Sequence, residues 1–290
     1  MPTPAQLCPF CRGLNSAGER RCYRCGKPLP GPLASGLIGS LRGAFSGDAP
    51  VTKLLLALNV IVAALGVASD RRVPIIDTAG GSLHMATFSL STMLRFGFLW
   101  RDLAQFEPWR YLAAVFVHFN VLHLLMNGWS FIAVGPQAER HFGRARFLTL
   151  FMVSGILGFV ASQWWYGDSS GTAGASGAVF GAFASVVGVA YARRDPNWKA
   201  LLVQNAVNLV IIALVFPVNN AAHLGGALTG GALGFLFSKE PRKLKLDIPF
   251  GILAVLLVIA AIGSVILSAT SPVWRAVRAQ EQRQAESREF

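Results

Sequence analysis

The stretch Gly174-Ala175-Ser176-Gly177-Ala178-Val179-Phe180-Gly181 opens a long apolar run and places one serine among glycines and alanines. Because the neighbouring side chains are small, nothing bulky shields the hydroxyl of Ser176. A later apolar run opens with Ala222-His223-Leu224-Gly225-Gly226. A serine and a histidine, each at the start of a segment long enough to cross a membrane, indicate a nucleophile and its base inside a bilayer.

The composition indicates a polytopic membrane protein. Of the 290 residues, 53% are hydrophobic and only 14% are charged, whereas a soluble domain carries about 25% charged residues. The net charge of +12 does not point to nucleic acid, because lysine and arginine in a membrane protein mark mostly cytoplasmic loops. We therefore expect the lipid bilayer as a partner and no nucleic acid. The polar N-terminus, rich in cysteine and proline, does not have the pattern of a cleavable signal peptide.

Seven apolar stretches of about 17–21 residues predict seven transmembrane helices. They cover residues Thr52–Ala68, Asn120–Glu139, Phe147–Tyr166, Ala175–Ala192, Ala200–Phe216, Ala221–Phe237 and Ile248–Ser268. Between the first two stretches, short apolar pieces alternate with charged residues, a pattern typical of helices that lie at the membrane interface. Asn120 is expected to cap the second span.

The predicted fold is an all-α polytopic membrane protein with a small N-terminal module. Residues 1–30 form a zinc ribbon, and residues 31–51 form a linker with a short surface helix near Leu37–Phe45. A six-span core covers residues 52–238, a seventh span covers 239–270, and 271–290 is a polar tail. Most of the 26 lysines and arginines lie in the N-terminal region and in the loops on its side of the membrane. The N-terminus is therefore predicted in the cytoplasm and, with seven spans, the C-terminus outside.

All four cysteines lie in two pairs, Cys8-x-x-Cys11 and Cys22-x-x-Cys25. Two such pairs match a tetrahedral four-thiolate site for structural Zn²⁺. The alternatives are disulfides or unpaired thiols, and the surrounding arginines favour the reducing cytoplasmic side, where disulfides are rare. Four thiolates leave no open position on the metal, so no catalytic cofactor is expected. Three roles stay open for the module: binding a cytoplasmic partner, binding a substrate's cytoplasmic tail, or neither.

The predicted orientation places four polar side chains at one depth, near the outer ends of spans two, four and six. They are Ser176, His223, His123 and Asn127, the last two lying on one helix face because they are four residues apart. A neutral imidazole can accept the proton of a serine hydroxyl, and free N–H groups at a helix start can bind an oxyanion. These three spans carry no acidic residue near His223, so we expect a Ser–His dyad without a carboxylate. Taken alone, Ser176 and the glycines at four-residue spacing also fit ordinary close helix packing.

These residues resemble the rhomboid family of intramembrane serine proteases over about residues 52–238. The resemblance rests on Trp109-Arg110, His123-x-x-x-Asn127, Gly135-x-x-x-Glu139-x-x-x-Gly143, Gly174-Ala175-Ser176-Gly177 with Gly181, and Ala222-His223-x-x-Gly226-x-x-x-Gly230. It implies Ser176 as nucleophile, His223 as general base and acid, and an oxyanion hole formed by His123, Asn127 and the Ser176 N–H. It also implies that Trp109-Arg110 and a histidine such as His118 hold a half-embedded first loop. Expected substrates are membrane helices, cut near their outer ends.

The sequence departs from the family pattern in a few places. Phe180 stands where many relatives have a tyrosine that packs on the catalytic histidine, and Pro217-Val218-Asn219-Asn220 is short for a cap over the active site. A zinc ribbon ahead of a rhomboid core resembles a bacterial arrangement, which predicts the bacterial plasma (inner) membrane. These departures leave open an alternative function, a proteolytically inactive rhomboid-like adaptor that binds client membrane helices. A transporter is disfavoured, because no inverted repeat is evident.

Overall fold

The computed structural model describes residues 6–8, 13–16, 19, 21–27, 29, 48–70, 87–167, 171–215, 219–239 and 247–287. The chain divides into two compact units, Met1–Pro50 and Val51–Phe290. Cys11, the expected surface helix at Leu37–Phe45 and the Pro217-Val218 part of the expected short cap lie outside the described residues.

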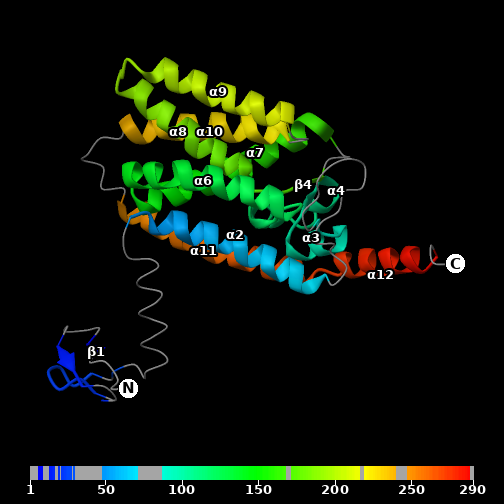
Figure 1. Cartoon of the computed structure of the whole chain (residues 1–290), viewed down its shortest axis with the longest axis horizontal. Helices are drawn as coiled ribbons and strands as arrows, with labels where there is room; N and C mark the ends of the chain where they lie inside the picture. The colour runs from blue at the N-terminus through cyan, green and yellow to red at the C-terminus, as the bar shows by residue number, and fades with distance from the viewer. Residues whose placement is uncertain are drawn as a thin grey trace. The chain divides into compact units, whose positions relative to one another are not determined.

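The second unit consists almost entirely of helices (Figure 1). They are α2 (Pro50–Ser69), α3 (Leu90–Phe96), α4 (Arg101–Ala104), α5 (Arg110–Ala113), the 3₁₀ turn η2 (Ala114–Phe116), α6 (Val121–Phe142), α7 (Arg144–Tyr166), α8 (Ser176–Ala192), α9 (Trp198–Val215), α10 (Asn220–Lys239), α11 (Asp247–Thr270) and α12 (Val273–Glu286). Each of the seven stretches predicted to be helical is a helix within a few residues of its expected bounds, which confirms the all-α class.

The long helices have the surface of a membrane protein. Among the described residues, α2, α7 and α11 are long and apolar enough to cross a membrane, and α6 joins them if it forms one bent span with Arg110–Phe116, across a bend of 87°. The shorter α8 is apolar over 17 residues. Large apolar side chains such as Trp129, Trp164 and Ile259 are exposed, as a lipid-facing surface requires. The chain is thus a multi-pass membrane protein, and the count of seven spans stays a prediction.

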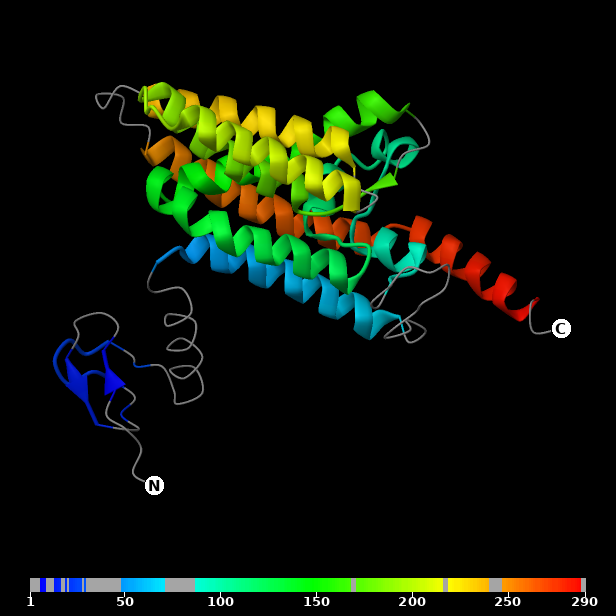
Figure 2. The ribbon, with the colours of Figure 1, turned by 45° about the horizontal axis from the view of Figure 1, so that its top comes forward.

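Helix α7 is central to the bundle. It packs against α8, α10 and α11, and its residues Phe147, Leu150 and Phe151 are completely buried in the main hydrophobic core. Figures 1 and 2 show the long helices running side by side, with α3 and α12 beyond one end of the bundle. The core thus fixes the helices that carry the candidate site, which lies near that same end.

Glu139 joins two helices that are far apart in sequence. Its carboxylate accepts hydrogen bonds from the backbone N–H groups of Val51 (2.9 Å) and Thr52 (2.7 Å) and from the Thr52 hydroxyl (2.8 Å). Those N–H groups belong to the first turn of α2, where a helix has unpaired donors and favours a negative charge. The Glu139 carboxylate therefore caps the start of α2 and fixes this helix against α6.

The C-terminal residues contain a helix that the hydropathy pattern does not predict. Within the polar tail expected at residues 271–290, Val273–Glu286 form helix α12, which packs against α3. Trp274 and Val277 are partly buried against the same apolar cluster as Leu94 and Phe96 of α3. The apolar positions are few and are separated by arginine and glutamine, so composition alone hides the amphipathic face.

Two short strand pairs complete the described structure. In the first unit, β1 (Gln6–Leu7) pairs antiparallel with β2 (Leu14–Asn15). In the second, β3 (Leu99–Trp100) pairs antiparallel with β4 (Gly171–Thr172), with Leu99 opposite Thr172. The second pair joins the loop before α8 to the segment that precedes α6.

Candidate functional site

Ser176 is the first residue of α8, and a tight turn presents it. Gly174 in that turn has φ of +127°, and its N–H donates to the carbonyl of Ala114 at 2.9 Å. A Cβ on Gly174 would lie 2.8 Å from Cε1 of His123, so both the backbone conformation and the space require glycine. The turn leaves Ser176 half-buried with its hydroxyl directed at the start of α10.

His223 lies in the first turn of α10 and reaches Ser176. Its Nε2 is 2.8 Å from the Ser176 Oγ, within hydrogen-bond distance, and its side chain is almost completely buried. Its Nδ1 has no hydrogen-bond partner among the residues that the structure describes. The Phe180 ring lies 4.6 Å from the imidazole, centroid to centroid, at an interplanar angle of 35°. The phenyl ring thus packs on His223 without offering it a hydrogen bond.

Asn219, just before α10, anchors the start of that helix. Its Oδ1 accepts from the N–H of Ala222 at 2.9 Å, and its Nδ2 donates to the hydroxyls of Ser162 and Thr172. The cap therefore ties the turn that carries His223 to α7 and to β4. The sequence analysis includes Asn219 only in the short connection before this helix and does not predict its capping role, although an asparagine directly before a predicted helix is a recognisable capping signal.

Small residues bring α8 and α10 into backbone contact. A Cβ on Gly226 would overlap the backbone of Gly177, and a Cβ on Gly230 would overlap that of Gly181. A Cβ on Gly234 would likewise overlap the carbonyl of Ser185. The glycines at four-residue spacing thus pack the helices closely, as predicted. This close approach is what allows the short serine side chain to meet the histidine.

His123 lies beside the pair, at the start of α6. The side chain of Asn120 accepts from the His123 N–H at 2.7 Å, which confirms the predicted cap. The position that a Gly174 Cβ would take is 3.1 Å from His123 Nε2 and 3.8 Å from Ser176 Oγ, so the imidazole and the hydroxyl both lie close to Gly174. Phe119 stacks on the His123 ring, with centroids 5.6 Å apart.

Asn127 is nearly buried one turn further along α6. Its Nδ2 donates to the His123 carbonyl at 2.9 Å, a bond within the helix. One amide hydrogen remains for a ligand, because the side chain carries two. The structure therefore brings Ser176, His223 and His123 together, and shows Asn127 bonded to its own helix.

Arg110 holds the segment before α6, as the family resemblance implies. It is fully buried, its Nε donates to Glu107 Oε2 at 2.6 Å, and one Nη donates to the carbonyls of Leu94 (2.8 Å) and Phe98 (3.1 Å). His118, the other residue expected to hold this segment, is buried edge-on against His123, with ring centroids 5.0 Å apart.

In the first unit, three of the four cysteines meet. The Sγ atoms of Cys8, Cys22 and Cys25 all lie within 4.8 Å of one another, and those of Cys8 and Cys25 are 3.6 Å apart. Two thiolates at about 2.3 Å from a tetrahedral zinc ion are about 3.8 Å apart, so the observed spacing fits this metal. The backbone N–H of Arg24 points at the Cys22 sulfur, at 3.4 Å.

The fold and the site together define a class: a helical multi-pass membrane protein with a serine and a histidine in hydrogen-bond contact at the starts of two adjacent helices. Residues 105–240 match the rhomboid domain. The chain is 32% identical over 162 residues to "Putative rhomboid protease YdcA" of Bacillus subtilis, which covers 50% of this chain and 79% of the relative. The chain belongs to the rhomboid family.

Other relatives match over longer or shorter regions. "Rhomboid protease GluP" of Bacillus subtilis is 30% identical over 236 residues, covering 78% of this chain and 42% of that protein. "RHOMBOID-like protein 2" of Arabidopsis thaliana is 33% identical over 162 residues, covering 53% and 50% of the two chains. The chain spans about half the length of several of the curated relatives it matches.

Proposed function

We propose that the protein is an intramembrane serine endopeptidase that cleaves transmembrane helices of other membrane proteins near the outer face. The observation that carries the proposal is the 2.8 Å contact between Ser176 Oγ and His223 Nε2. Two relatives are named rhomboid proteases, which supports this activity in the family. Our proposal includes the bacterial plasma membrane as location, with the N-terminus in the cytoplasm.

The proposed reaction proceeds through an acyl-enzyme. His223 Nε2 accepts the hydroxyl proton as Ser176 Oγ attacks the carbonyl carbon of the scissile peptide bond. The same nitrogen then gives the proton to the leaving amine as the C–N bond breaks, which leaves an ester on Ser176. His223 Nε2 then takes a proton from a water molecule as that water attacks the ester carbon, and it returns the proton to Ser176 Oγ as the ester C–Oγ bond breaks and the acid product leaves.

The negatively charged oxygen of the tetrahedral intermediate needs hydrogen-bond donors that stabilise its charge. We assign this role to the Ser176 backbone N–H at the start of α8, to His123 and to Asn127. The position of both His123 and Ser176 beside Gly174 supports the assignment for His123. Removing one such donor typically lowers kcat by about 10²–10³-fold.

The test is cleavage of a model single-span substrate in detergent by wild type, Ser176→Ala and His223→Ala. We expect cleavage by the wild type only, and labelling of the wild type by a fluorophosphonate probe at Ser176. Equal cleavage by all three proteins would refute the assignment. A wild-type protein that binds the substrate without cleaving it would favour the helix-binding adaptor instead.

For the first unit we propose one structural zinc ion per chain, held by Cys8, Cys22, Cys25 and Cys11. The three described sulfurs support it by their spacing. Metal analysis of purified protein should find one zinc per chain that a strong chelator releases, with four thiols becoming reactive. Protein free of metal, with all four thiols reactive before chelation, would contradict the proposal.

A further inference from the structure

The candidate nucleophile is tied to the segment that precedes α6. Residues 87–119, here called the loop segment, contain β3, which pairs with β4 four residues before Ser176. The same segment supplies the Ala114 carbonyl that accepts from the Gly174 N–H. Two backbone connections therefore join the loop segment to the turn that presents Ser176, so a displacement of this segment moves the serine.

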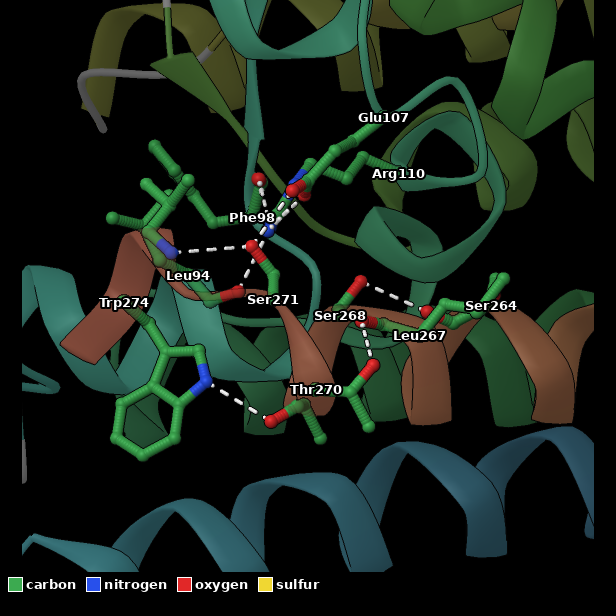
Figure 3. Close-up of polar contacts among 12 residues, drawn as sticks. Leu94, Phe98, Glu107, Arg110, Ser264, Leu267, Ser268, Thr270, Ser271 and Trp274 are labelled. Atoms are coloured by element: carbon green, nitrogen blue, oxygen red, sulfur yellow. Dashed lines mark hydrogen bonds and ion pairs between the residues drawn. The ribbon is translucent and has the colours of Figure 1, made fainter. Parts of the chain in front are cut away.

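The end of α11 is built into the polar core of the loop segment (Figure 3). The Ser271 hydroxyl donates to Glu107 Oε1 at 2.7 Å, and both residues are buried. The other oxygen of Glu107 is the partner of Arg110, which in turn binds the Leu94 and Phe98 carbonyls. Ser271 thus completes the buried network that shapes the loop segment around β3.

Helix α12 binds the same segment at a second place. The Glu281 carboxylate accepts from the Ser91 N–H at 3.1 Å and from the Ser91 hydroxyl at 2.6 Å. Ser91 is in the first turn of α3, where unpaired N–H donors favour an anion, so Glu281 caps α3 from a distant part of the chain. Arg278 on the same helix donates to the Ser69 carbonyl and the Thr92 hydroxyl, both at 3.3 Å.

The indole of Trp274 fixes the junction between α11 and α12. Its Nε1 donates to the Ala269 carbonyl at 3.0 Å, and the Arg95 guanidinium lies 4.9 Å from its ring centroid. Arg95 belongs to the last turn of α3. Helix α12 therefore contacts both ends of α3: Glu281 binds its first turn, and Trp274 contacts Arg95 in its last turn.

We propose that the end of α11 together with α12 forms a C-terminal clamp that holds the loop segment, and through it the Ser176 turn, with Ser271 and Glu281 as positioning residues for the reaction. The inference rests on the proposed function for its catalytic part. The clamp lies outside the matched domain at residues 105–240, so the domain match does not predict it.

The test uses the full chain in detergent, with Ser271→Ala and Glu281→Gln compared with two matched controls. Ser264→Ala removes a buried hydroxyl of α11 that donates to the Ala261 carbonyl of its own helix at 2.7 Å and has no other hydrogen bond among the described residues. Glu286→Gln neutralises an exposed carboxylate on α12. Three measurements are made well below the thermal midpoint: amide hydrogen exchange of α3, the rate of fluorophosphonate labelling of Ser176, and steady-state kinetics that give kcat and KM for a single-span substrate.

We expect Ser271→Ala and Glu281→Gln to speed exchange in α3 while leaving α10 protected. Labelling and kcat should fall by about three- to tenfold, as the loss of one or two buried hydrogen bonds implies, with KM unchanged. The controls should match the wild type in all three measurements. A purely structural role would lower the thermal midpoint without changing the labelling rate.

Each contrary result has a distinct meaning. Unchanged exchange in α3 would refute the clamp, and faster exchange with wild-type labelling and kcat would refute the positioning role. A wild-type protein with no labelling and no cleavage would refute the proposed function, and the positioning role with it. The exchange of α3 would still decide separately whether the clamp exists.

Discussion

Gly230→Ala should separate the two helices that carry Ser176 and His223. A Cβ at this position would overlap the Gly181 backbone, and Cβ atoms do not come closer than 3.0 Å to such neighbours, so α8 and α10 must move apart by about 1 Å. The Ser176–His223 distance of 2.8 Å would then grow to about 3.8 Å, beyond a hydrogen bond. Misplacement by about 1 Å can lower a rate by roughly 10²-fold. We therefore expect fluorophosphonate to label Ser176 about 10²-fold more slowly in Gly230→Ala than in the wild type.

The neighbouring glycine provides the control. A Cβ on Gly231 would lie 3.6 Å from the Ala184 carbonyl, an ordinary contact, so Gly231→Ala should label at the wild-type rate. Both variants carry the same substitution in the same helix, and only the packing differs. The assay is the rate of fluorophosphonate labelling, with the thermal midpoint measured alongside. Gly230→Ala protein that stays folded and labels as fast as Gly231→Ala would refute the claim that close packing sets the dyad.

Two further predictions test the surroundings of the site. Arg110→Ala leaves Glu107 buried without its cation, which should lower stability by about 3–5 kcal/mol, seen as a lower thermal midpoint in detergent; an unchanged midpoint would contradict the buried pair. Gly174→Ala combines a strained φ with a clash against His123, so labelling should fall at least about tenfold. Gly143→Ala has a positive φ of +78° but open space, so it should affect stability and leave labelling unchanged; equal labelling by both variants would contradict the clash.

Hydropathy and charge were sufficient to predict the long helices, because each is a nearly uninterrupted apolar run of membrane length. The Gly226 and Gly230 pattern also predicted close packing, since four-residue spacing places both glycines on one helix face. The sequence did not predict the distance between Ser176 and His223. That distance depends on how α8 and α10 meet, which is a tertiary property.

The clamp could not be predicted from the sequence in the same way. Glu281 and Ser91 are separated by 190 positions, and nothing near either residue indicates the other. In the sequence, nothing distinguishes Glu107 from an exposed loop carboxylate, and its contacts with Ser271 and Arg110 are visible only in the structure. The only sequence signal for helix α12 is the three-residue spacing of Trp274 and Val277, which places both side chains on one helix face.

Three different kinds of interaction hold the site residues in place, and mutations that disrupt each of them should have different effects. The glycines of α8 and α10 set the distance between Ser176 and His223 by backbone contact. The Asn120 cap orients the start of α6, where His123 lies. The loop segment fixes the Ser176 turn through β3–β4, and Arg110 holds that segment. A change at the glycines of α8 and α10 should alter the reactivity of Ser176 most, because it changes the distance between the reacting atoms. A change at Arg110 must first deform the loop segment, so it should reduce the stability of the protein more than the reactivity of Ser176.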